Sequence, residues 1–130
     1  MKKILIDTNI YCNAMRGIKS AVDIIQYAEN ILMSPIVIGE LYSGFKNGKY
    51  EKRNREQLRK FISSPRIKLL QITDYTSDFY SHILTQLRKN GTPIPTNDIW
   101  IAASVFENGA KLASLDSHFL KVEGLQLVDL

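Results

Sequence analysis

Short apolar runs alternate along this chain with longer segments whose apolar residues recur at helical spacing. The apolar runs predict β-strands at residues 3–7, 31–34, 67–72, 111–115 and 125–128. The helical spacing predicts helices at residues 18–28, 35–45, 50–62, 74–90 and 98–108. Strands that alternate with helices are typical of the α/β class. We therefore expect a three-layer α/β/α fold in which helices cover both faces of a five-stranded parallel sheet.

Local signals mark the ends of several predicted helices. Pro35 suits the first turn of its helix, and Gly91 and Gly109 are natural stops. Thr73 or Asp74 can cap the long helix, and Thr96 or Asn97 can cap the helix that begins at Asp98.

Length and composition indicate one globular domain spanning residues 1–130, with 45% hydrophobic and 23% charged residues. No apolar run approaches the roughly 20 residues that a membrane helix needs. Asp7 interrupts the first apolar run too early for a signal peptide, so we expect a cytoplasmic protein without membrane association. Cys12 is the only cysteine, which excludes an intrachain disulfide and fits a reducing compartment.

Four acidic residues stand at the ends of predicted elements or on an apolar face. Asp7 ends the first strand, Asp98 opens an apolar helix, and Asp116 follows the strand at 111–115. Glu40 lies on the helix at 35–45, where its neighbours one turn away are apolar or small. Each acid also has an ordinary explanation as a turn residue, a helix cap or a paired side chain. Ligands of parallel sheets bind beyond the carboxyl ends of the strands, however, and two of these acids fall there.

If the fold brings these acids close together, their mutual repulsion favours the binding of a cation. At a separation of about 5 Å and an effective dielectric constant near 20, each ionised pair repels by about 3 kcal/mol. Such a site either takes up protons or binds a divalent ion, and oxygen ligands select Mg²⁺ or Mn²⁺. Zinc is disfavoured because His82 and His118 lack close ligand spacing. His82 is interpreted as a partly buried surface residue, and His118 as either close to the site or an exposed turn residue.

The charge distribution is compatible with a nucleic-acid partner. The net charge is +4, from 17 basic and 13 acidic residues. Without the four candidate acids, 9 acidic residues remain, and the rest of the chain carries a net charge of +8. Residues 46–60 hold seven basic side chains against two acidic ones. This segment is either a phosphate-binding surface or an ordinary solvated helix face.

The local motifs carry a family resemblance that runs from Ile4 to Val128. They are Asp7-Thr8-Asn9, Glu40-Leu41-Tyr42-Ser43-Gly44, the segment from Asn97 to Ala103, and the segment from Ser114 to Phe119 before Gly124-Leu125. In this order, the motifs resemble the PIN domain, and more closely the VapC-type toxins of bacterial and archaeal toxin–antitoxin pairs.

The resemblance implies a ribonuclease that leaves 5′-phosphate and 3′-hydroxyl ends. It implies one or two metal ions held by Asp7, Glu40, Asp98 and Asp116. We expect Asp7 and Asp98 to bind metal directly, and the other two acids to bind directly, through water, or to help deprotonate the nucleophile. Thr8, Asn9 and Ser114 would fix the carboxylates, with Ser114 standing where threonine is commoner in the family.

The resemblance also implies partners. A small antitoxin would cover the acidic groove, and the toxin would form a homodimer. Five of the six tyrosines offer aromatic area for such contacts, with core packing as the default explanation for most of them: Tyr11, Tyr27, Tyr42, Tyr75 and Tyr80.

Competing functions make different demands on the sequence. A haloacid-dehalogenase-type phosphatase needs an acid two residues after Asp7, where this chain has Asn9. A phosphorylated receiver module needs an acid pair and a downstream lysine in a pattern that is absent. A stand-alone RNA-processing nuclease and a catalytically silent PIN module that only binds RNA or protein remain open, and a metal-dependent ribonuclease assay separates the silent module from either nuclease.

Overall fold

The computed structural model describes residues 2–130 and has a parallel sheet at its centre. The strands, in sheet order β3-β2-β1-β4, are β1 (Lys3–Ile6), β2 (Asn30–Met33), β3 (Ile67–Leu69) and β4 (Lys111–Ala113). Every pairing is parallel, with Leu5 opposite Leu32 of β2 on one side and Leu112 of β4 on the other. The predicted α/β class with a parallel sheet is therefore confirmed.

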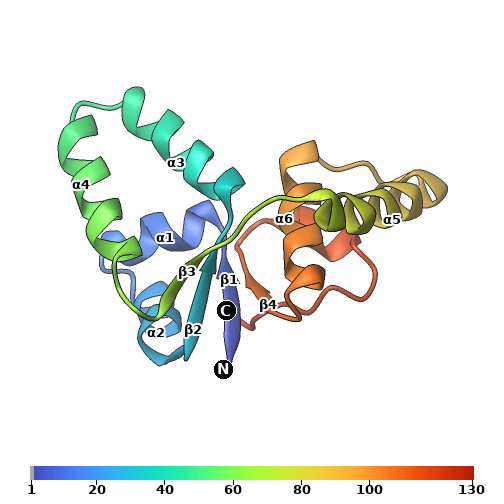
Figure 1. The fold of residues 1–130 in the computed structure, drawn as a ribbon, viewed down its shortest axis with the longest axis horizontal. Coiled ribbons are helices and arrows are strands. Elements are labelled where there is room, and N and C mark those ends of the chain that lie inside the picture. Colours follow the sequence, from blue (N-terminus) through green and yellow to red (C-terminus); the bar gives the residue numbers. More distant parts are fainter. Residues whose placement is uncertain (1) are drawn as a thin grey trace.

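The helices flank the sheet in two groups. They are α1 (Thr8–Met15), α2 (Lys19–Tyr27), α3 (Pro35–Lys46), α4 (Glu51–Ile62), α5 (Asp74–Asn90) and α6 (Thr96–Glu107), followed by a short 3-10 helix, η1 (Ser117–Lys121). Figure 1 shows α1 to α4 on the side of β2 and β3, and α5 and α6 on the side of β4. None of the helices among residues 2–130 is long and apolar enough to cross a membrane.

The prediction of a fifth strand at residues 125–128 was wrong. This segment makes only an isolated parallel bridge between Leu127 and Leu112. Two backbone hydrogen bonds hold it, from Leu112 N to Gln126 O at 2.9 Å and from Val128 N to Leu112 O at 2.8 Å. The described sheet thus has four strands, because the segment touches β4 around one residue and does not continue alongside it.

Two helix starts also differ from the sequence-based expectation. The motif Asp7-Thr8-Asn9 opens α1, which the apolar pattern did not predict, and the Asp7 carboxylate caps it by accepting from Thr8 N at 2.8 Å. Helix α6 begins at Thr96, earlier than expected, with Pro95 at the N-cap and no side-chain cap from Thr96 or Asn97. Gly91 ends α5 as predicted, in the left-handed conformation with φ of 64° that glycine adopts without strain.

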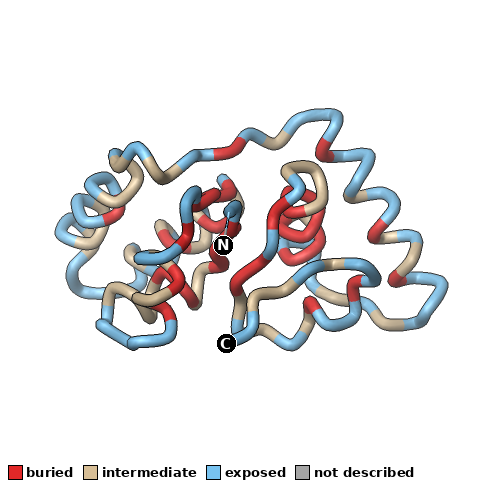
Figure 2. Tube along the Cα trace, turned by 90° about the horizontal axis from the view of Figure 1, so that it is seen from below, coloured by how far each residue is buried: buried red, intermediate tan, exposed pale blue. Residues whose placement is uncertain are grey.

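The core lies between the sheet and the helices, and α6 is its most buried helix. Figure 2 shows buried residues concentrated at the centre of the molecule, and these include β1, β2, β4 and α6, with exposed segments around them. Residues 101–105 of α6 are all buried, as expected for a helix that is apolar almost all round. This packing places Asp98, at the start of α6, in a protected position with only 7% exposure.

Candidate functional site

Asp7 lies where β1 meets β4 at the carboxyl edge of the sheet. Its backbone N–H donates to Ala113 O at 2.9 Å, which joins the ends of the two strands. Asp7 is 5% exposed, and its carboxylate receives two hydrogen bonds, from Thr8 N at 2.8 Å and from the Ser114 hydroxyl at 2.6 Å. The strand pairing therefore fixes both the position and the orientation of this acid.

Glu40 reaches the same region from α3. One of its oxygens accepts a hydrogen bond from the Thr8 hydroxyl at 2.6 Å, and the other accepts from Asn97 Nδ2 at 3.3 Å. Thr8 thus connects two acids, since its backbone N–H binds Asp7 and its hydroxyl binds Glu40. The contact of Asn97 with Glu40 was missed by sequence reasoning, which treated Asn97 as a helix cap.

Asp98 and Asp116 meet around an imidazole. His118 Nδ1 lies 2.8 Å from Asp98 Oδ2 and 3.0 Å from Asp116 Oδ1. The three residues each offer one ligand atom, and these atoms lie within 4.8 Å of one another. Asp116 also caps η1 by accepting from His118 N at 3.0 Å, so the short helix holds His118 close to the acids.

The electrostatics connect the two buried acids, Asp7 and Asp98, with nearby carboxylates. Burial raises the pKa of Asp7; hydrogen bonds from Ser114 and Thr8 oppose this rise, and the charges of Glu40 and Asp98 add to it. Burial also raises the pKa of Asp98; the His118 contact opposes it, and Asp116 and Glu40 add to it. Each buried acid therefore carries an electrostatic cost when ionised, which a nearby cation would relieve.

The donor chemistry fits a divalent cation. Carboxylate oxygens, which suit Mg²⁺ and Mn²⁺, predominate, and the three-residue group around His118 has the spacing of metal ligands. Asp7 and Asp98 are the most buried acids of the four, and Glu40 and Asp116 are half-buried. The residues could accordingly surround an ion from several sides.

Of the residues predicted to support the acids, Ser114 bonds to a carboxylate and Asn9 bonds to the backbone. Ser114 donates to Asp7 and also accepts from Asp116 N at 3.0 Å, so it touches two of the acidic positions. Asn9 accepts from Leu115 N at 3.2 Å and orders the backbone before Asp116, and no bond from it to a carboxylate is found in residues 2–130. His82 is distant from this chemistry and exposed on α5, where 80% of its side chain meets solvent, so its expected partial burial was wrong.

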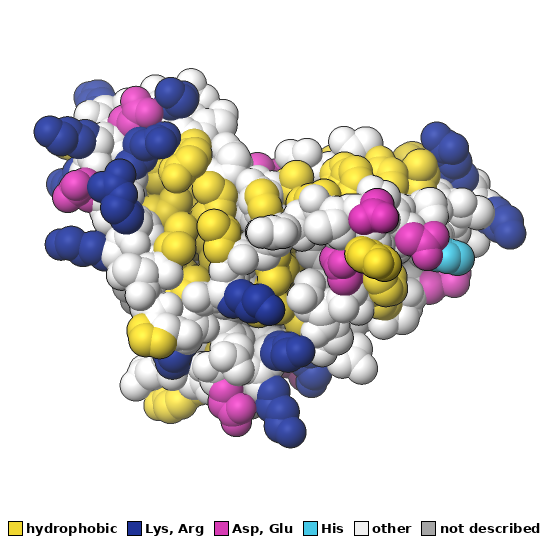
Figure 3. Space-filling model, viewed as in Figure 1, with side chains coloured by type: hydrophobic (Ala, Val, Ile, Leu, Met, Phe, Trp, Pro, Cys, Tyr) yellow, Lys and Arg dark blue, Asp and Glu magenta, His cyan; other side chains and the backbone are white. Residues whose placement is uncertain are grey.

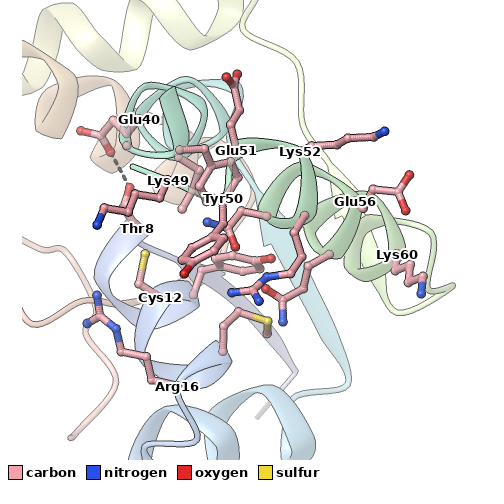
Figure 4. Close-up of a pocket in the computed structure, with 18 residues that line it drawn as sticks. Thr8, Cys12, Arg16, Glu40, Lys49, Tyr50, Glu51, Lys52, Glu56 and Lys60 are labelled. Atoms are coloured by element: carbon pink, nitrogen blue, oxygen red, sulfur yellow. Dashed lines mark hydrogen bonds between the residues drawn. The ribbon is translucent and has the colours of Figure 1, made fainter. Parts of the chain in front are cut away.

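A groove of about 1300 Å³ leads away from the acids between α1, α3 and α4. Figure 4 shows Thr8 and Glu40 joined at one end and the side chains of α4 along the opposite wall. Its floor includes Tyr11, Met15, Leu41 and Phe45. Its rim includes Lys49, Lys52, Arg53 and Lys60, and Figure 3 shows basic side chains gathered at this end of the molecule beside a hydrophobic band.

Comparison with known proteins agrees with this fold. Residues 4–125 match the PIN domain, so the chain belongs to the PIN-domain family. It is 32% identical to ribonuclease VapC2 of Haemophilus influenzae, over 88% of this chain and 86% of that protein.

Solved structures give the same assignment of fold. VapBC2 from Rickettsia felis, bound to a DNA fragment from its promoter, matches with a TM-score of 0.83 and 26% identity over 98% of both chains. VapBC-1 from nontypeable Haemophilus influenzae matches with a TM-score of 0.82 over 99% of this chain and 98% of that chain, and its 24% identity supports the fold alone.

Proposed function

We propose that this chain is a metal-dependent endoribonuclease that acts as the toxin of a toxin–antitoxin pair. The observation that carries the proposal is a pair of linked acid contacts beyond the carboxyl edge of the sheet. Thr8 bonds to both Asp7 and Glu40, and His118 contacts both Asp98 and Asp116. Burial raises the pKa of both buried acids, Asp7 and Asp98, and the charge of Glu40 adds to the rise in each. The family membership and the ribonuclease relative support the same activity. The RNA substrate would place the activity in the cytoplasm.

The proposed chemistry is hydrolysis of an RNA phosphodiester bond. A bound Mg²⁺ or Mn²⁺ would supply positive charge that stabilises the phosphate and makes water easier to deprotonate. Asp7 and Asp98 would hold the ion, and Glu40 and Asp116 would bind it directly or through water. A carboxylate of the latter pair would accept the proton of the attacking water, and Thr8 and Ser114 would keep Glu40 and Asp7 oriented.

Helix α4 is the proposed contact for the RNA backbone. Lys52, Arg53 and Lys60 line the groove that begins at Glu40, so a strand lying along it would meet positive charge before reaching the acids. Tyr50 adds an exposed aromatic ring, with the Arg53 guanidinium 4.5 Å from its centre. Charged and aromatic groups together are typical of single-stranded RNA binding.

The proposed protein partner is a cognate antitoxin that occupies the same groove. The apolar floor suits the hydrophobic face of a helix, and the acids at the end suit a basic side chain. A homodimer is also proposed, for which Tyr27 and Tyr75 provide exposed aromatic area. Tyr11 is buried and Tyr80 stacks on Trp100 at a centroid distance of 4.2 Å, so these tyrosines belong to internal packing.

The direct test is cleavage of a labelled RNA by the purified full chain in Mg²⁺, in Mn²⁺ and in EDTA. We expect cleavage with either metal and none in EDTA. Asp7→Asn should abolish cleavage with an unchanged circular dichroism spectrum, whereas Asp78→Asn, an exposed acid on α5, should cleave normally. Full activity of Asp7→Asn with metal present would overturn the assignment, and RNA binding without cleavage by the wild type would indicate a silent module.

The toxin role has a separate test in cells. Expression of the chain alone should arrest growth, and co-expression of a small DNA-binding protein encoded next to it should restore growth and co-purify with it. Cleavage without growth arrest or such a partner would indicate a stand-alone RNA-processing nuclease.

A further inference from the structure

His118 lies close to the acids, which is one of the two positions that the sequence left open for it. It lies on η1, and its backbone N–H is held by the carboxylate of Asp116. Its Nδ1 faces two acids, at 2.8 Å from Asp98 Oδ2 and 3.0 Å from Asp116 Oδ1. The side chain of His118 is 39% exposed and that of Asp98 is 11% exposed, so the imidazole meets the acids from the solvent side.

The distances match those between neighbouring ligands of one ion. In an octahedral site with metal–ligand bonds of about 2.1 Å, adjacent ligand atoms lie roughly 3.0 Å apart. The ligand atoms of Asp98, Asp116 and His118 all lie within 4.8 Å of one another. A neutral imidazole would present a nitrogen lone pair toward an ion held there, beside two negatively charged oxygens.

We propose that His118 is a nitrogen ligand of the cation and gives this site a preference for Mn²⁺ over Mg²⁺. The inference rests on the proposed function, because it concerns the ion that this function requires. Mn²⁺ is a first-row transition metal that tolerates one imidazole nitrogen among carboxylates, whereas Mg²⁺ dehydrates reluctantly and favours oxygen ligands. A site with His118 beside the carboxylates therefore differs from the all-oxygen site expected from the sequence.

Two roles of His118 make different predictions. If His118 only orients Asp98 by hydrogen bonding, removing it weakens the binding of both ions to a similar extent. If its nitrogen binds the ion, removal weakens Mn²⁺ binding more, and the nitrogen leaves a magnetic signature on bound Mn²⁺. The only other histidine, His82, is exposed on α5 and serves as a matched control.

The experiment measures Mn²⁺ and Mg²⁺ binding to the full chain by calorimetry, and records electron spin echo envelope modulation of bound Mn²⁺. We expect ¹⁴N modulation from a directly bound imidazole in the wild type and in His82→Ala, and its loss in His118→Ala and His118→Gln. Mn²⁺ affinity should fall at least about tenfold in the His118 variants, with a smaller fall for Mg²⁺. Circular dichroism establishes that the variants are folded.

The outcomes separate this inference from the proposed function. Mn²⁺ binding to the wild type without ¹⁴N modulation would overturn the role of His118 as a ligand and leave the nuclease proposal standing. Equal losses of Mn²⁺ and Mg²⁺ affinity in the variants would also overturn it, in favour of orientation alone. Failure of the wild type to bind either ion would overturn the metal dependence itself, and the role of His118 with it.

Discussion

The hydroxyl of Ser114 donates a 2.6 Å hydrogen bond to Oδ2 of Asp7, although the two residues are 107 positions apart in the chain. The contact exists because β1 and β4 are parallel neighbours whose carboxyl ends coincide, with Ile6 opposite Ala113. The same hydroxyl accepts from Asp116 N at 3.0 Å. One small side chain therefore fixes the spacing of two acids that arrive from different strands.

Removing this hydroxyl should weaken metal binding. In Ser114→Ala, Asp7 loses the hydrogen bond that most lowers its pKa, so its ionised form becomes less favourable. We expect divalent-ion affinity to fall about tenfold or more, with a parallel loss of RNA cleavage. Isothermal titration with Mn²⁺ measures the affinity directly.

Ser114→Thr is the matched control, since it keeps the hydroxyl and adds one methyl group. It should retain metal affinity close to that of the wild type. If Ser114→Ala and Ser114→Thr bind Mn²⁺ equally well, the hydrogen bond to Asp7 does not organise the site.

Much of this arrangement was predictable because apolar runs report buried strands directly. Asp7 and Asp116 were expected at the same sheet edge, and the structure links them there through the Ser114 hydroxyl, which donates to the Asp7 carboxylate and accepts from Asp116 N. Helix α1 was missed because Asp7-Thr8-Asn9 favours turns as strongly as helix starts. The fifth strand was predicted wrongly because the apolar pattern at residues 125–128 is the same for a segment that pairs through a single bridge and for a full strand.

The sequence contains no comparable pattern that predicts contacts between the ends of different helices. His118 and Asp98 are 20 positions apart, and no period in the sequence relates a 3-10 helix to the first turn of α6. Asn97 meets Glu40 across 57 positions through its side chain alone. Such pairs depend on how α3, α6 and η1 pack, which tertiary structure determines and local pattern does not.

Asp7→Asn should stabilise the protein when metal is absent. Burial raises the folded-state pKa of Asp7 above its usual 3.8, so the unfolded chain releases this proton at lower pH than the folded chain. The wild type therefore loses stability as pH rises from about 3.8 through the folded pKa, and the loss is complete at higher pH. The variant, which cannot ionise, should unfold at higher urea concentration than the wild type at neutral pH in EDTA.

The difference in stability between wild type and Asp7→Asn should shrink in acid, where both folded and unfolded Asp7 are protonated. Adding Mn²⁺ should reverse the order at neutral pH, because the ion stabilises the folded wild type by binding to it. If Asp7→Asn is less stable than the wild type in EDTA, the hydrogen bonds from Ser114 and Thr8 outweigh the free-energy cost of burying the ionised carboxylate.

Neutralising the groove rim should weaken RNA binding without altering the acids. Lys52 and Lys60 line the groove from α4 and are exposed. In Lys52→Gln/Lys60→Gln we expect a higher KM for RNA, little change in kcat, and a salt dependence of binding that is less steep by about 1.4 in the log–log slope, from two lost phosphate contacts. Fluorescence anisotropy at several salt concentrations measures the slope.

Lys68→Gln/Lys89→Gln is the charge-matched control, because these lysines are exposed and lie outside the groove. It should keep the KM and salt slope of the wild type. An equal change in both double variants would mean that net charge, and not the α4 surface, attracts the RNA.

Tyr11→Phe should stabilise the fold and remove one source of alkaline sensitivity. Tyr11 is 2% exposed and its hydroxyl has no hydrogen-bond partner within residues 2–130, while its ring packs edge-on against Phe61 at 5.2 Å. Removing a buried hydroxyl without a partner should raise the free energy of unfolding by about 1 kcal/mol, since phenylalanine keeps the ring contact. Urea denaturation at neutral pH measures this gain.

The alkaline effect follows from the pKa of the same hydroxyl. Burial raises the pKa of Tyr11 from 10.0 to about 12, so the unfolded chain ionises first and the wild type loses stability between these values. The stability gap between Tyr11→Phe and the wild type should therefore widen as pH rises above 10.0. Tyr27→Phe, at a tyrosine that is 65% exposed, should show no such widening. A constant gap in Tyr11→Phe would mean that the Tyr11 hydroxyl ionises equally readily in the folded and unfolded chains.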